Sequence, residues 1–124
     1  MRGQDGIAPA RPAGLDEERM RRFLEAAVAA AFDLPAEDIS RPTRCGVAVA
    51  FARQVAMYVA HVDLGLSLTA AGRLFGRDRT TAAHACQVVE DRRDEAEVET
   101  VLAAIETAAQ AWWRLGARVG EGVR

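Results

Sequence analysis

Residues 75–86, FGRDRTTAAHAC, place a run of polar side chains just before an alanine-rich stretch that is typical of a helix. The run consists of Arg77, Asp78, Arg79, Thr80 and Thr81. Guanidinium and hydroxyl groups at the start of a helix can hydrogen-bond to base edges and bind phosphates. A helix N-cap would explain Asp78, but it would leave the arginines and threonines without a role. We therefore interpret this run as a nucleic-acid-binding surface rather than a reaction centre.

The elements that must position this run are predicted to be helices, because apolar residues recur at helical spacing and no stretch resembles a strand. Polar N-caps, glycines and prolines bound the segments. The predicted helices cover residues 16–32, 47–61 or 47–63, 68–76, 78–93 and 95–115, with a short turn within PAEDIS. A short helix, a glycine-containing turn and a longer helix with a polar start form a helix-turn-helix outline. In that motif the second helix enters the major groove of DNA.

Composition narrows the function classes. All sixteen basic residues are arginine, so the lysine that a Walker A loop or a Schiff base requires is missing. We expect no enzyme activity, no nucleotide, no cofactor and no metal site. The chain of 124 residues has a net charge of −2, which is a weak global signature for a nucleic-acid-binding protein. Residues 41–93, however, hold eight arginines against four acidic residues, a local net charge of +4.

Cysteine usage and hydropathy indicate the compartment. Cys45 and Cys86 lack the spacing of a disulfide or metal motif, and no apolar stretch is long enough to cross a membrane. We expect a cytoplasmic, nucleoid-associated protein with free thiols, in which His84 is a packing residue. The predicted organisation is a flexible leader, a helix-turn-helix domain and a C-terminal extension, at residues 1–14, 15–111 and 112–124.

Residues 52–86 resemble the C-terminal DNA-binding domain, domain IV, of the bacterial replication initiator family DnaA. The matching pieces are RQVAMY, SL, FGRD, TT and HAC, in this order. The likeness extends over roughly residues 15–109 and is strongest between residues 53 and 90. It implies an all-α protein, a small helical bundle with a helix-turn-helix of the DnaA domain IV and TrpR-like type. It also implies binding as a monomer to a short, asymmetric box of double-stranded DNA.

The resemblance further implies a recognition helix in the major groove and a basic loop in the minor groove. Its expected DNA contacts are Arg44, Arg53, Gln54, Thr69, Arg77, Asp78, Arg79, Thr80 and Thr81. Arg44 is the candidate for the minor groove. Arg79 stands where the family usually has histidine. We hypothesise that Arg79 reads a guanine through O6 and N7, the commonest specific contact of an arginine, and thereby changes the preferred box.

The chain departs from the family pattern in its turn, its basic loop and its recognition helix. The turn has one glycine instead of two, the loop RPTRCGVAVAF keeps few basic residues, and HACQVVE lacks the usual arginine and lysine. Fewer phosphate contacts weaken binding and reduce its salt dependence. We therefore expect a DNA affinity below that of the family, or an affinity that depends on a partner.

DnaA carries an ATPase module before this domain, and we expect no counterpart of it within these 124 residues, which are too few and contain no lysine. We hypothesise a transcription regulator, an activator that acts with a protein partner linked to RNA polymerase. Such a protein is similar to the DnaA-type activators of gene transfer agents in alphaproteobacteria. Two alternatives stay open: a replication-control accessory that competes for DnaA boxes, and a protein–protein interaction module that has lost DNA binding.

Trp112 and Trp113 are the second notable feature of the sequence. Neighbouring side chains on a helix point about 100° apart, so both rarely bury in one small core. We expect one tryptophan to pack on the first helix and the other to lie at the surface. The alternative is a partner-binding anchor, because tryptophan is enriched in interface hot spots.

Overall fold

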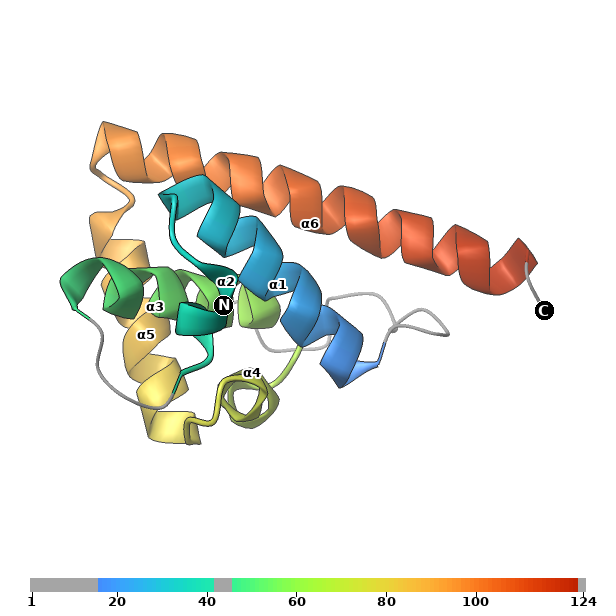
Figure 1. Cartoon of the computed structure of the whole chain (residues 1–124), viewed down its shortest axis with the longest axis horizontal. Helices are drawn as coiled ribbons and strands as arrows, with labels where there is room; N and C mark the ends of the chain where they lie inside the picture. Colours follow the sequence, from blue (N-terminus) through green and yellow to red (C-terminus); the bar gives the residue numbers. More distant parts are fainter. Residues whose placement is uncertain (1–15, 42–45, 123–124) are drawn as a thin grey trace.

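Six helices make up the part of the chain that the structure describes (Figure 1). This computed structural model describes residues 16–41 and 46–122, with side chains described as far as residue 116. The helices are α1 (Glu17–Phe32), α2 (Ala36–Ile39), α3 (Val47–Val62), α4 (Leu68–Leu74), α5 (Arg79–Arg92) and α6 (Ala96–Gly122). No strand occurs within these ranges, and the prediction of an all-α bundle is confirmed.

Three of the helices begin at a short polar residue whose side chain satisfies a free backbone N–H. Asp16, Ser67 and Asp78 precede α1, α4 and α5. Each side chain accepts a hydrogen bond from the N–H three residues further along, at 2.9, 3.0 and 2.9 Å respectively. An uncapped N–H would be left without a partner at each of these ends. These local signals explain why the predicted starts of the helices are correct within one residue.

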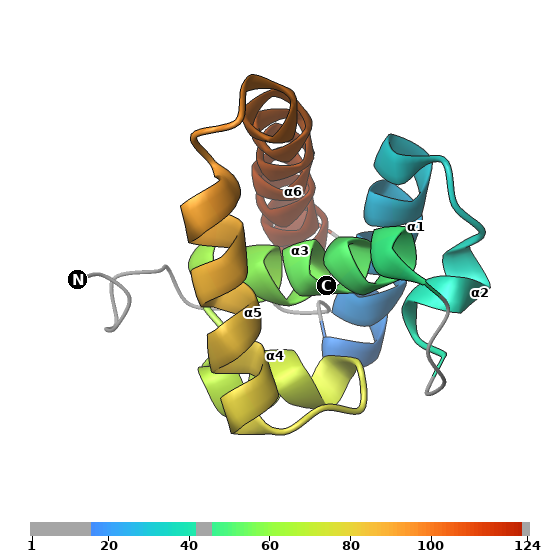
Figure 2. The ribbon, with the colours of Figure 1, turned by 90° about the vertical axis from the view of Figure 1, so that its left-hand side faces the viewer.

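The hydrophobic core is built around α3. This helix is apolar on all sides, and ten of its residues are buried. In Figure 2 it runs through the centre of the bundle with α1 on one side and α5 on the other. The fully buried side chains include Leu24 of α1, Val59 of α3 and Val89 of α5. Each such side chain contributes about 1.5–3 kcal/mol through its removal from water.

The longest helix, α6, packs against both α1 and α3 and continues beyond them (Figure 1). Trp112 stacks on Phe23 of α1, with ring centroids 4.4 Å apart and an interplanar angle of 9°. Trp113 is only 9% exposed and joins the core. The expectation that one tryptophan lies at the surface is therefore wrong, because α6 packs against both α1 and α3, and Trp112 is half-buried while Trp113 is buried. A partner-binding role for the two tryptophans stays a prediction.

The expected domain boundary between residues 111 and 112 falls inside α6, which continues to Gly122 without a break. Among the described helices, none combines the length and the hydropathy that crossing a membrane requires.

The turn between α4 and α5 is held by close backbone approach. The carbonyl oxygen of Gly72 accepts hydrogen bonds from the N–H groups of Phe75 and Arg77, at 3.0 and 2.9 Å. A Cβ atom on Gly72 would lie 2.7 Å from the carbonyl oxygen of Arg77 and 2.8 Å from that of Asp78. Gly76 within the turn has a φ of +70°, a conformation that favours glycine. These two glycines fix the angle at which α5 leaves α4.

Candidate nucleic-acid interface

The first turn of α5 is open to solvent. Asp78, Arg79, Thr80 and Thr81 are all exposed. Figure 2 shows that this turn and α4 lie together at one end of the bundle, away from the start of α6. The backbone N–H of Thr81 is the main cause of a lowered pKa at Asp78. The carboxylate therefore stays ionised and caps the helix end, where the side chain of Thr81 also bonds to it, whereas the side chains of Arg79 and Thr80 are exposed.

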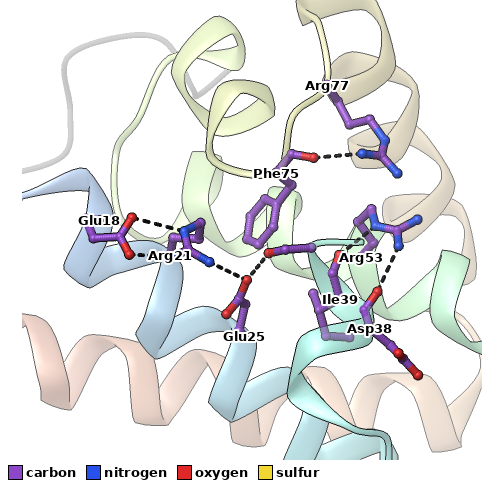
Figure 3. Close-up of polar contacts among 9 residues, drawn as sticks. Glu18, Arg21, Glu25, Asp38, Ile39, Arg53, Phe75 and Arg77 are labelled. Atoms are coloured by element: carbon purple, nitrogen blue, oxygen red, sulfur yellow. Dashed lines mark hydrogen bonds and ion pairs between the residues drawn. The ribbon is translucent and has the colours of Figure 1, made fainter. Parts of the chain in front are cut away.

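The two arginines of this turn have different surroundings. Nη1 of the half-buried Arg77 donates a hydrogen bond to the carbonyl oxygen of Phe75 at 2.8 Å (Figure 3). This contact folds Arg77 back over the turn that it follows. Arg79 is exposed, and no hydrogen bond or ion pair joins its side chain to the described part of the chain. Arg79 is thus the cation of this turn that is available to an incoming anion.

Arg53, an expected DNA contact, lies inside the protein with 7% of its surface exposed. Its Nε donates to the carbonyl oxygen of Ile39 at 2.7 Å, and its Nη2 donates to that of Asp38 at 3.0 Å (Figure 3). Nη2 also donates to the carbonyl oxygen of Arg41 at 3.1 Å. Arg53 therefore ties α3 to residues 38–41. Its burial has a signal in the sequence, because a helix that is mostly apolar on all sides is favoured in the core.

Two of the remaining expected contacts lie on α3 and α4. Gln54 is half-buried in α3, and Thr69 is exposed in the first turn of α4. Arg44 lies outside the described residues. Arg41, which precedes it, is exposed and forms an ion pair with Asp38 at 3.4 Å.

Comparison with known proteins bears on this geometry. Residues 23–89, more than half of the chain, match the family described as "Bacterial dnaA protein helix-turn-helix". The chain belongs to this family. The matched segment begins within α1 and ends within α5, and it includes α4, the turn and all but the last three residues of α5. The resemblance to DnaA domain IV is thereby confirmed.

Two relatives illustrate the relationship. The chromosomal replication initiator protein DnaA of Bifidobacterium animalis subsp. lactis (strain AD011) is 42% identical over 71 residues, which are 56% of this chain and 12% of that protein. A crystal structure described as that of a DNA replication initiation factor superposes with a TM-score of 0.67 at 26% identity. That match covers 78% of this chain and 30% of the other. The chain thus spans less than a third of the length of either relative.

The DnaA-type helix-turn-helix carries one exposed cation that the sequence alone did not single out. Arg73 lies on α4, four residues after Thr69, and only these two residues of α4 are exposed. Nη2 and Nε of Arg73 donate to the carboxylate of Glu17 at 2.8 and 3.3 Å. The spacing of four residues is a sequence signal for a shared helix face, whereas the pairing with Glu17 depends on tertiary structure.

His84 is a second residue that sequence reasoning misplaced. It was expected to be a packing residue, but it is exposed on α5, one helical turn beyond Thr80. The neighbouring Cys86 is half-buried, and burial, assisted by the charge of Glu90, raises the pKa of its thiol to about 11. Cys86 therefore stays protonated at neutral pH and packs as a small apolar residue.

At the other end of α5 the arginines are engaged by carboxylates. Arg92 forms an ion pair with Glu95 at 3.0 Å and lies over the ring of Phe51, 4.2 Å from its centroid. Arg93 donates to Glu99 at 2.7 and 2.9 Å. It also contacts Glu106 at 3.1 Å. The positive charge counted in residues 41–93 is therefore only partly available to DNA.

Proposed function

We propose that this protein binds double-stranded DNA sequence-specifically, with the N-terminal end of α5 in the major groove. One observation carries the proposal: the polar residues that begin the second helix of a DnaA-type helix-turn-helix are exposed, and Arg79 among them has no partner in the described part of the chain. An unpaired guanidinium keeps its full hydrogen-bonding capacity for a base edge. A bidentate contact from Arg79 to guanine fits this position.

The other residues take supporting roles in the proposal. Thr80 and Thr81 contact bases or flanking phosphates, and Asp78 caps the helix that presents them. Arg77 stabilises the turn. Thr69, Gln54 and Arg44 stay proposed contacts to the backbone or minor groove.

For Arg53 we propose positioning rather than direct contact. Its donors hold three carbonyl groups within residues 38–41. Those residues lead into the basic loop, so the guanidinium fixes the place from which that loop departs.

For the biological role, we propose a transcription regulator, an activator that acts with a protein partner linked to RNA polymerase. Several arginines bond to carbonyl or carboxylate groups of the protein itself and are therefore not available for phosphates. Fewer phosphate contacts weaken DNA binding by this domain alone, which supports dependence on a partner. A specific observation favours a second role, competition for the boxes of DnaA: the chain shares 42% identity over 71 residues with a replication initiator. Selection of binding sites from random duplexes separates the two roles. Competition requires the box that DnaA binds, whereas a regulator with its own target genes can bind a different box.

The test of DNA binding compares two arginines at opposite ends of α5. Arg79→Ala should weaken specific binding by roughly 5- to 150-fold, the effect of losing one good base contact. Arg92→Ala removes the same charge from the end that is engaged by Glu95, and should change binding far less. Binding is measured by fluorescence anisotropy on the selected duplex and on a scrambled one.

The double variant Arg79→Ala/Thr81→Ala, checked for helicity by circular dichroism, should bind both duplexes equally weakly. Equal losses for Arg79→Ala and Arg92→Ala would show that only overall charge matters and would contradict the proposal. If the wild-type protein bound no duplex even at low salt, the interaction-module alternative would hold instead.

A further inference from the structure

Arg73 is placed where the helix-turn-helix meets the DNA backbone. It shares the one exposed face of α4 with Thr69, because residues four apart lie one above the other on a helix. Its side chain is 60% exposed. In a helix-turn-helix complex the first helix of the motif crosses the phosphate backbone. A guanidinium on this face is therefore within reach of phosphates when α5 occupies the groove.

The free protein instead gives this guanidinium a carboxylate partner from another helix. Glu17 lies in the first turn of α1, and its two carboxylate oxygens accept from Nη2 and Nε of Arg73 at 2.8 and 3.3 Å. The carboxylate raises the pKa of Arg73, chiefly through these hydrogen bonds. The fork-to-fork geometry is the one that an arginine also makes with a phosphate.

We propose that Arg73 is a phosphate-binding residue that Glu17 masks, so that the ion pair lowers the affinity of the protein for DNA. The proposal rests on the DNA-binding function proposed above. On binding, Arg73 exchanges the carboxylate of Glu17 for a phosphate. An exposed ion pair contributes only about 0.2–1 kcal/mol, so the exchange is accessible. The displaced carboxylate then faces the negatively charged backbone, which adds to the loss of affinity.

The neighbouring residue Glu18 provides a matched control. It lies in the same first turn of α1 and is exposed, but its carboxylate pairs with Arg21 rather than with Arg73. Glu17→Gln and Glu18→Gln therefore remove the same charge from the same helix end. A difference between them isolates the release of Arg73 from the general loss of negative charge.

The experiment measures binding of the full chain to one duplex over a series of salt concentrations. Glu17→Gln should bind roughly 1.5- to 5-fold more tightly than Glu18→Gln, which is the exposed-pair energy converted to an affinity ratio. Because Arg73 contacts a phosphate in the complex of either variant, the slope of log affinity against log salt should be the same for both, and Arg73→Ala should lower it by up to about 0.9. Introducing Arg73→Ala should abolish the difference between the two variants.

Equal affinities of Glu17→Gln and Glu18→Gln would overturn the proposal. A gain in Glu17→Gln that persists in the Arg73→Ala background would overturn it as well, because Arg73 would not be the group released. Both results leave the proposed function itself testable, since Arg79→Ala would still weaken specific binding. Conversely, a wild-type protein without any duplex preference would contradict the proposed function, while the salt slopes would still report on Arg73.

Discussion

Two arginines lie at each end of α5, but the surroundings of the two pairs differ. At the start, Arg79 faces solvent without an acidic partner in the described part of the chain, and Arg77 bonds a carbonyl group. At the end, Arg92 and Arg93 are held by carboxylates from the segment that leads into α6 and from α6 itself. The comparison shows that tertiary structure, rather than the number of arginines, decides which end of a helix can attract DNA.

The C-terminal end of α5 is also a structural junction. Burial raises the pKa of Tyr58, so its hydroxyl stays protonated and donates to Glu90 at 2.6 Å. The same oxygen accepts from Nη1 of Arg93 at 2.9 Å. Arg93 then reaches Glu99 and Glu106 of α6. This network joins α3, α5 and α6, and it is the reason why the arginine here contributes to stability rather than to recognition.

The largest effect on this comparison is expected from Arg93→Ala. Removing Arg93 leaves Glu99, Glu106 and the hydroxyl of Tyr58 without their shared cation. Breaking one partner of a buried ion pair costs about 3–5 kcal/mol. Because the side chains of Arg93 and Glu99 are 25% and 45% exposed, the network is only partly buried and we expect a smaller loss, about 2–3 kcal/mol in the free energy of unfolding, measured by denaturant titration.

Arg79→Ala is the matched variant at the other end of the helix, and it should change the free energy of unfolding by less than about 0.5 kcal/mol. A stability loss of equal size in the two variants would show that the ends of α5 do not differ as described.

A smaller effect is expected from Gly72→Ala, which tests how the open end is positioned. The new methyl group would meet the carbonyl oxygens of Arg77 and Asp78 at 2.7 and 2.8 Å, and both are backbone atoms that cannot rotate away. Overpacking of this kind costs about 1–3 kcal/mol. Because the turn must shift, specific DNA binding should fall together with the free energy of unfolding.

Gly76→Ala is the control for that experiment. A Cβ atom there meets no described atom within 4 Å, but φ is +70°. It should cost about 1–2 kcal/mol through backbone strain. DNA binding that is unchanged in a folded Gly72→Ala protein would mean that the close approach does not set the angle of α5.

The helices could be predicted from the sequence because their signals are local. Ser67 and Asp78 cap their helices as expected, and apolar periodicity placed α1, α3 and α5 within two residues of their ends. The polar first turn of α5 was likewise found from residue type and order alone. Both features depend on contacts between residues a few positions apart.

The charge environment could not be predicted in the same way, since it depends on residues far apart in the chain. Glu17 and Arg73 are separated by 56 positions, and Tyr58 and Arg93 by 35. No periodicity relates such pairs. Arg53 is an intermediate case, because its apolar neighbours in α3 are a local signal for burial, whereas the resemblance to DnaA pointed to DNA contact. A charge count therefore overestimates the basic surface, although residue type and order locate the exposed turn that carries Arg79.

Asp63→Asn tests the acidic side of the junction. Asp63 follows α3, and its Oδ1 accepts from Nε2 of Gln110 at 3.2 Å. Its buried Oδ2 has no hydrogen-bond partner in the described part of the chain. Burial, followed by the neighbouring carboxyl of Glu106, raises the pKa of Asp63 from 3.8 to about 8, against an opposing effect of Arg93.

Because the pKa of Asp63 is raised in the folded protein, its carboxyl is protonated there but ionised in the unfolded chain at any pH between about 4 and about 8. Stability should therefore fall as the pH rises through this window. Asparagine cannot ionise, so Asp63→Asn should raise the melting temperature most at about pH 9 and flatten its decline. Glu97→Gln, which removes an exposed carboxylate of α6, should keep the wild-type decline. Parallel curves for wild type and Asp63→Asn would contradict the raised pKa of Asp63. In that case only the arginines would distinguish the two ends of α5.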